Sequence, residues 1–175
     1  MRFAYALIAP LLLAACGGDT TDDVSTASLR DAMVDIVEPA SDDIQTIAFE
    51  LYDEDGELDP TRLNGSQWDQ LYEAAREIEQ VALALEDAAS LTVVAEGETI
   101  QNEGNDGAST AEDVASYIAA DPEGWASEAR ALAGIGQALS IAAESRDPIA
   151  LDEAAFALTD SCTSCHEKFW YKQGD

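Results

Sequence analysis

The chain has 175 residues, of which 36 are acidic and 8 are basic, which gives a formal net charge of −28. A surface this negative repels the phosphates of nucleic acids and of anionic lipid head groups, so both are poor partners for the folded domain. It favours instead a partner protein with a basic docking surface.

The first residues predict a segment that directs export. Arg2 precedes an apolar run over residues 3–13, which is too short to span a bilayer. Cys16 then follows small residues in the sequence Leu-Ala-Ala-Cys-Gly, which resembles a bacterial lipobox. The resemblance implies that residues 1–15 are a lipoprotein signal peptide and that Cys16 is lipidated. The alternative is an ordinary signal peptide cut nearby, which would leave Cys16 free.

Both kinds of signal peptide predict that the protein is exported from the cytoplasm. We expect a domain that faces the periplasm and contacts the membrane only through its N-terminal lipid. Residues 16–27, rich in Gly, Asp, Thr and Ser, predict a flexible tether. Gly17 stands where an aspartate would signal inner-membrane retention in some bacteria, which favours the outer membrane.

Residues 28–173 predict an all-α domain, because Ala, Leu and Glu are frequent and apolar residues recur at spacings of three and four. The first such stretch covers residues 29–51, and Pro39 is expected to kink or divide it. The second covers residues 66–89, with Ser66 as the expected N-cap. The two apolar stripes are Leu29, Met33, Ile36, Ala40, Ile44, Ile47 and Leu51, then Trp68, Leu71, Ala75, Ile78, Ala82, Leu85 and Ala89.

A long connection and two further helices follow. Residues 96–107 are polar and glycine-rich and predict a loop, whereas residues 110–120 predict one short helix. Asp121-Pro122 and Asp147-Pro148 each place a capping residue before a proline, which predicts two helix starts. Their stripes are Trp125, Ala129, Leu132, Gly136, Leu139 and Ala143, then Leu151, Ala155, Leu158, Cys162, Cys165 and Phe169.

Together these stretches predict an antiparallel four-helix bundle with a long crossover between helices 2 and 3. Alanine and glycine dominate the later stripes. Small residues leave room for a flat cofactor, but close packing of the helices explains them equally well.

The last stretch carries the chemistry. Cys162 and Cys165 are spaced C-x-x-C, and His166, the only histidine of the chain, follows directly. C-x-x-C-H is the attachment signal of c-type haem: both thiols add to the porphyrin vinyl groups and the imidazole coordinates the iron. The motif predicts one covalently bound haem c.

Three other readings of the motif are weaker. Structural zinc normally takes four ligands, and the chain has no second cysteine pair. A thioredoxin-like dithiol needs a βαβ context, which the helical pattern denies. A lipoprotein whose cysteine pair binds no haem stays open as a third possibility.

The motif continues as Glu167-Lys168-Phe169, and on the last helix of an acidic bundle it resembles the class II c-type cytochromes, the cytochrome c-prime family. The resemblance covers residues 26–173, but its specificity lies in residues 162–169. It implies a haem near one end of the bundle, with the first helix over the far face of the iron. It also implies electron transfer or the binding of small gases, often in a homodimer.

Met33 decides between these functions. Six-coordinate members of the family take a methionine from the first helix, so the resemblance makes Met33 the distal iron ligand; the alternative is a methionine that fills a gap in the core. A His166/Met33 pair of ligands predicts a carrier of single electrons and not an enzyme. An open distal face predicts instead a five-coordinate protein that binds nitric oxide or carbon monoxide.

Several other residues have structural interpretations. Trp68 and Trp125 are expected to anchor the core. Arg76 and Arg130 are expected to form ion pairs on helix surfaces rather than to reach a haem propionate. The aromatic residues 169–171 are expected to shield the edge of His166 or to form a docking patch.

Overall fold

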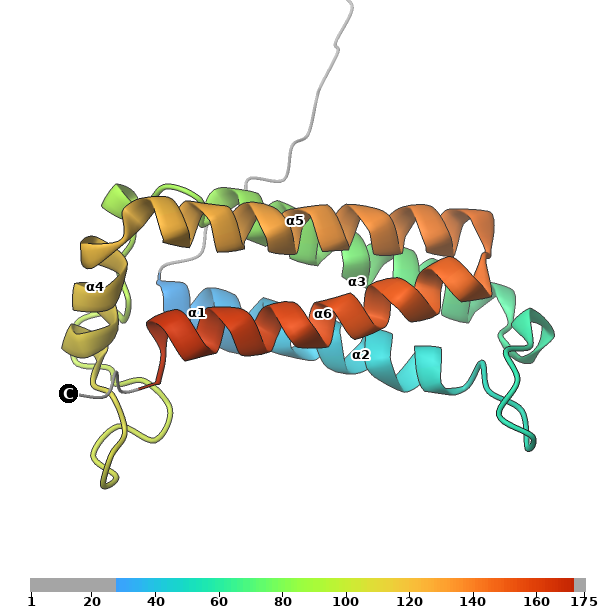
Figure 1. Ribbon diagram of the computed structural model, residues 1–175, viewed down its shortest axis with the longest axis horizontal. Helices are drawn as coiled ribbons and strands as arrows, with labels where there is room; N and C mark the ends of the chain where they lie inside the picture. The colour runs from blue at the N-terminus through green and yellow to red at the C-terminus, as the bar shows by residue number, and fades with distance from the viewer. Residues whose placement is uncertain (1–27, 172–175) are drawn as a thin grey trace, which may run out of the picture.

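The computed structural model describes residues 28–171, so the predicted signal peptide, the lipidation at Cys16 and the tether lie outside the described residues. Within the described range the secondary structure is helical, apart from an isolated antiparallel bridge between Tyr52 and Leu58 (Figure 1). The all-α prediction is confirmed. None of the helices in this range is long and apolar enough to cross a membrane.

The first helical stretch is continuous from residue 29 to residue 49. It consists of α1 (Leu29–Ala32), the π-helical turn η1 (Met33–Val37) and α2 (Glu38–Phe49). In the π-helical turn the backbone N–H of Glu38 donates to the carbonyl oxygen of Met33, five residues earlier. Pro39, which has no N–H to donate, follows at the start of α2. The irregularity expected at Pro39 therefore takes the form of a π-helical turn, and the helix is not divided.

The π-helical turn also changes which residues face the core. Val37 is 6% exposed, whereas Ile36, the residue expected in the stripe, is only half-buried. A π-helical turn accommodates one residue more than an α-helical turn, so the apolar face shifts by one position. Ile36, which a regular α-helix would place in the stripe, packs only at the edge of the open-half cluster for this reason.

The next long helix, α3 (Gly65–Ala84), begins after the short 3₁₀ turn η2 (Pro60–Arg62). Asn64, not Ser66, is its N-cap: the Asn64 side chain accepts from the Ser66 N–H at 2.9 Å and from the Gln67 N–H at 3.2 Å. Gln67 accepts in return from the Asn64 N–H at 3.0 Å, which completes a capping box. The helix ends at Ala84, so Ala89 lies outside it and is exposed.

The connection between α3 and α5 contains the 3₁₀ turn η3 (Ala88–Ser90) and the short helix α4 (Ala111–Ala120). The two predicted Asp-Pro starts are confirmed. Asp121 accepts from the Gly124 N–H at 2.9 Å and begins α5 (Pro122–Ser145). Asp147 accepts from the N–H groups of residues 149 and 150 and begins α6 (Pro148–Phe169).

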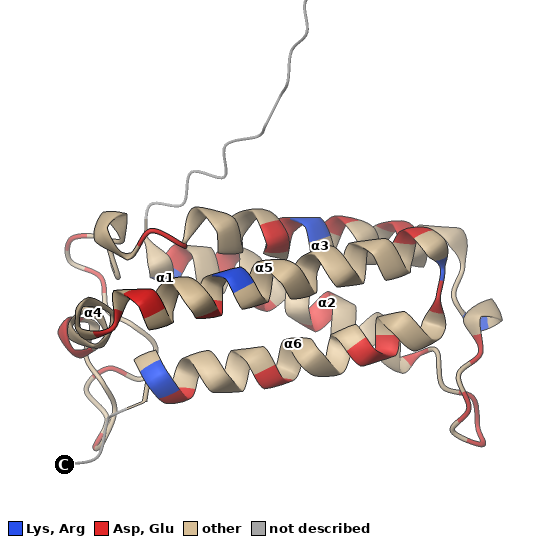
Figure 2. Ribbon diagram, turned by 45° about the horizontal axis from the view of Figure 1, so that its top comes forward, with Lys and Arg blue, Asp and Glu red and all other residues tan. Residues whose placement is uncertain are grey.

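The long helices pack side by side along their lengths (Figures 1 and 2). α3 packs along α5, α5 along α6, and α2 against both α3 and α6. Gly136 explains the close approach of α5 to α3: a Cβ atom there would lie 2.8 Å from the backbone nitrogen of Glu79 and 2.9 Å from the carbonyl oxygen of Ala75. At Gly136, therefore, the small residue serves helix packing.

Two apolar clusters divide the core along the helices. We call the first the closed half; its fully buried members include Ile44, Leu71, Ile78, Leu139, Leu151 and Leu158. We call the second the open half, which lies where α1 begins and α6 ends and which α4 and the loop before it cover (Figure 1). Its buried members include Leu29, Val81, Leu85, Val93, Ile100, Val114, Ile118, Trp125 and Phe169.

Candidate functional site

A cavity of about 430 Å³ lies in the open half. Met33 contributes to its α1 wall, and Cys162, Cys165 and His166 line it from α6. The structure thus brings the predicted haem-attachment residues and the predicted distal ligand to one cavity. α3, α5, α4 and the loop before α4 complete its lining.

A second hollow, of about 890 Å³, lies between the end of α3 and the start of α5. It is wide open to solvent, and its side chains that carry charge are Glu86, Asp87, Glu123 and Arg130. It contains no cysteine, histidine or methionine. The smaller cavity is therefore the candidate site, because it holds the residues with ligand chemistry.

The cysteines lie where the two halves of the core meet. Cys162 packs against the cluster of the closed half and Cys165 against that of the open half. Both are half-buried, and neither is in a disulfide. A planar group attached to both sulfurs would be held along the wall of α6, across the boundary between the two halves.

The protonation states disfavour dithiol redox chemistry and leave the imidazole able to bind a metal. Burial raises the pKa of the Cys162 thiol, and burial together with the charges of Glu128 and Cys162 raises the pKa of Cys165 to about 12. Desolvation lowers the pKa of His166. At neutral pH both thiols are therefore protonated, which makes them poor redox nucleophiles, and the imidazole is neutral, with a lone pair free for a metal.

Aromatic rings flank His166, which is itself exposed at the edge of the cavity. The ring of Trp170 lies 5.9 Å from the imidazole, centroid to centroid, and the ring of Tyr171 lies 6.1 Å away. These two rings flank the imidazole but leave it exposed, so the shielding expected of residues 169–171 is at most partial. Phe169 does not shield the imidazole: it is buried and stands edge-on to Trp125 at 5.4 Å.

The α1–α2 wall combines a thioether with an unpaired hydroxyl. Met33 is half-buried and begins the π-helical turn, a feature often found at functional sites. Ser41, two turns further along the same wall, is 8% exposed and its hydroxyl has no hydrogen-bond partner. Other helical hydroxyls of the chain, such as those of Ser140 and Thr163, donate to a carbonyl oxygen of the preceding turn.

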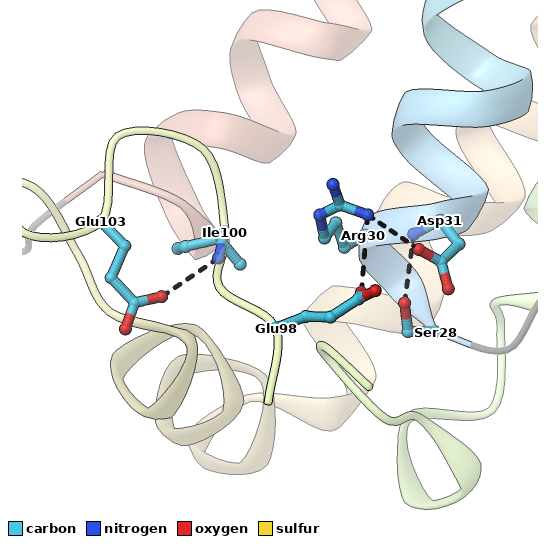
Figure 3. A network of polar contacts seen from close by, with 6 residues as sticks. All are labelled: Ser28, Arg30, Asp31, Glu98, Ile100 and Glu103. Atoms are coloured by element: carbon cyan, nitrogen blue, oxygen red, sulfur yellow. Dashed lines mark hydrogen bonds and ion pairs between the residues drawn. The ribbon is translucent and has the colours of Figure 1, made fainter. Parts of the chain in front are cut away.

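The loop before α4 is tied to α1 by polar contacts of Arg30, a residue that lines the cavity (Figure 3). The backbone N–H groups of Leu29 and Arg30 donate to the carbonyl oxygens of Thr92 and Val93, at 2.8 and 3.0 Å. The Arg30 guanidinium lies 3.0 Å from Asp31 and 3.5 Å from Glu98, a residue of the loop. These contacts hold the loop over the open half.

Sequence reasoning missed Arg30. Among the described residues that line the cavity it is the one arginine or lysine. Arg76 and Arg130 form the predicted surface ion pairs instead, with Glu79 and with Glu86. The available signal was the spacing, because Arg30 precedes Met33 by three residues and so lies on nearly the same face of the helix.

Sequence reasoning also missed Glu128, a carboxylate in the α5 wall. Its side chain is 13% exposed and pairs with Lys168 of α6. The Ser164 hydroxyl donates to the same carboxylate oxygen at 3.4 Å. Nothing in the sequence around Glu128 distinguishes it from the many other acidic residues, so only the packing of α5 on α6 reveals it.

The residues of the cavity fit a haem. A haem presents a flat apolar ring, two carboxylates and vinyl groups that can receive thiols. The cavity offers apolar side chains, Arg30 at the mouth, two protonated cysteines, and nitrogen and sulfur ligands at His166 and Met33. Within residues 28–171 no three His, Cys, Asp or Glu side chains converge as ligands for a bare metal ion. Haem iron needs no such cluster, because the porphyrin nitrogens supply its equatorial ligands.

No protein-family model, curated protein or solved structure matches the chain. The chemistry of the site is therefore argued from its own residues.

Proposed function

We propose that the chain is a monohaem c-type cytochrome of the class II, cytochrome c-prime type, which carries single electrons at the periplasmic side of a membrane. One observation carries the proposal: Cys162, Cys165 and His166 on α6 line the same cavity as Met33 on the α1–α2 wall. In this proposal the long helices are the antiparallel four-helix bundle of that family, and residues 85–121 are the crossover between its second and third helices.

Each residue of the cavity has a distinct role. Cys162 and Cys165 would hold the ring by thioether bonds, and His166 would ligate the iron from α6. The Met33 sulfur would be the second protein ligand, a soft one that raises the reduction potential. Arg30 would pair with the propionates. The bound haem supplies the one-electron couple of its iron.

The proposed ligand set makes the protein a carrier and not an enzyme, because His166 and Met33 together leave no iron position for a substrate. The surface supports a protein partner. Acidic residues are spread over the helices and loops and far outnumber basic ones (Figure 2), which favours salt-sensitive docking of a basic redox partner. Lipidation at Cys16 would keep the domain at the membrane, with the outer membrane favoured, and a homodimer is compatible with the proposal.

An absorption spectrum tests the proposal. The full chain would be expressed with the cytochrome c maturation machinery, and the double variant C162A/C165A would serve as the control. We expect low-spin bands with a sulfur-to-iron charge-transfer feature in the wild type, and no covalent haem in the control. Met33→Ala should convert the spectrum to high-spin. Wild-type protein without haem would refute the proposal, whereas an unchanged M33A spectrum would refute only the Met33 ligand.

A gas-binding function is the second candidate, and one observation favours it. The cavity extends along the α1–α2 wall beyond Met33 to Ser41, whose buried hydroxyl has no partner. This wall therefore has room and a hydrogen-bond donor for a small ligand such as nitric oxide. High-spin bands in the wild type that shift under carbon monoxide would select this function; bands indifferent to carbon monoxide would select electron transfer.

A further inference from the structure

Glu128 is set apart from the other acidic residues of the cavity by its burial. Glu38 and Asp42 also line the cavity, but both are exposed to solvent. The Glu128 side chain is 13% exposed. Its charge is therefore screened much less by water and salt than theirs.

The pairing of Glu128 with Lys168 does not cancel this charge at the cavity. The Lys168 side chain is 53% exposed, so its ammonium group is largely solvated, whereas the carboxylate is held inside. Lys168 is also absent from the cavity lining. Seen from the cavity, the pair is a dipole with its negative end inward.

The charge of Glu128 acts on the helix that carries the attachment motif. The carboxylate contacts Ser164 and Lys168, which lie on either side of Cys165 and one turn apart on α6. The thiol of Cys165 responds to both members of the pair, since Glu128 raises its pKa and Lys168 lowers it. A charge that acts at Cys165 also acts on a ring bonded to its sulfur.

We propose that Glu128 sets the reduction potential of this centre, by favouring its oxidised form with a buried negative charge, and that Lys168 moderates the effect. This inference rests on the proposed cytochrome function. Reduction adds one electron from the partner protein to the iron, so the reduced centre is more negative by one charge. A negative charge at the α5 wall opposes that addition.

Spectroelectrochemical titration of the haem-loaded full chain at pH 7 tests the inference. Glu128→Gln should shift the reduction equilibrium toward the ferrous form by on the order of tenfold, as expected for one charge at short range in a partly buried site. Lys168→Met should shift it the opposite way, and by less, because Lys168 is half exposed. Glu123→Gln, an exposed residue in the first turn of α5, is the matched control and should leave it unchanged.

The opposite signs separate electrostatics from structure. If Glu128 and Lys168 only hold α5 against α6, both variants should lower the unfolding temperature. The reduction equilibrium should then shift in the same direction in both variants or stay unchanged in both. Either of these results for the reduction equilibrium would overturn the inference. Glu128→Asp keeps the charge and should stay close to wild type; if E128Q fails to fold, the shift expected of Lys168→Met decides the question. Wild-type protein without haem would overturn the proposed function as well, whereas haem with an insensitive potential would overturn only the role of Glu128.

Discussion

The closed and open halves are built from the same helices, but different residues fill the space between them. In the closed half, side chains such as Leu71, Leu151 and Leu158 are at most 1% exposed and form a continuous apolar cluster. In the open half, by contrast, Met33 and Cys165 are only half-buried, and together with Cys162 at the boundary they line a cavity of about 430 Å³. The same helices therefore form a filled core in the closed half and border a cavity in the open half.

The largest expected effect is on the alkylation rates of Cys162 and Cys165, which lie where the two halves meet. In haem-free protein at pH 8, Cys165 should react with iodoacetamide about a thousandfold more slowly than in urea, because its pKa of about 12 leaves little thiolate. Cys162, whose pKa is also raised, should be slowed less. Raising the pH should speed both reactions. Mass spectrometry of the alkylated chain measures the rates, and equal rates in folded and unfolded protein would show that the site is not desolvated.

Shortening one side chain in each half tests the difference between the halves directly. Leu151→Ala should lower the free energy of unfolding of the haem-free protein by about 2–5 kcal/mol, because it leaves a cavity in a filled core. Met33→Ala should cost clearly less, because Met33 already borders empty space. Urea denaturation followed by circular dichroism measures both. A cost at Met33 as large as that at Leu151 would show that the open half also bears the stability of the fold.

Two glycines of α5 sharpen the comparison within one helix. Gly136→Ala should destabilise the protein by about 1–3 kcal/mol, since the new methyl group meets the backbone of α3. Gly134→Ala is the control: a Cβ there meets nothing within 4 Å, so helix propensity should stabilise it by about 0.5–1 kcal/mol. Thermal unfolding gives both values, and the signs should be opposite.

The smallest effect is expected from pH. Desolvation lowers the pKa of His166 in the folded state, so the unfolded chain binds the proton more readily. The haem-free protein should therefore be fully stable, with respect to this group, above about pH 6.5 and lose stability as the pH falls toward the lowered value. His166→Gln should remove this component, and the measurement is the urea midpoint of both proteins between pH 7.5 and 5.5. Parallel pH profiles would show that His166 is not desolvated in the fold.

Local signals predicted much of the fold. The Asp-Pro pairs marked the starts of α5 and α6, and the C-x-x-C-H spacing identified the residues that line the cavity on α6. The sequence pattern failed to predict two local features, the π-helical turn and the N-cap of α3. It did not predict the π-helical turn, which buries Val37 and leaves Ile36 half-buried at the edge of the cluster. It chose Ser66 as a cap although Asn64 with Gln67 makes the better reciprocal pair.

The residues that sequence reasoning missed have one property in common. Arg30 and Glu128 are ordinary charged residues on helices, and their significance comes from contacts with distant segments: Glu98 of the loop before α4, and Lys168 of α6. A periodicity describes one helix at a time and contains no information on such pairs. The Met33 ligand, the haem and the lipid anchor stay predictions.

The π-helical turn has a consequence for changes in chain length. Because it holds one residue more than an α-helix needs, deletion of one residue between 33 and 37 can be absorbed by conversion to a regular α-helix. Deletion of one residue from α2 cannot be absorbed in this way. It would rotate the preceding residues of the helix by roughly 100° about the helix axis. The first helix should therefore tolerate loss of Val34 but not of Thr46.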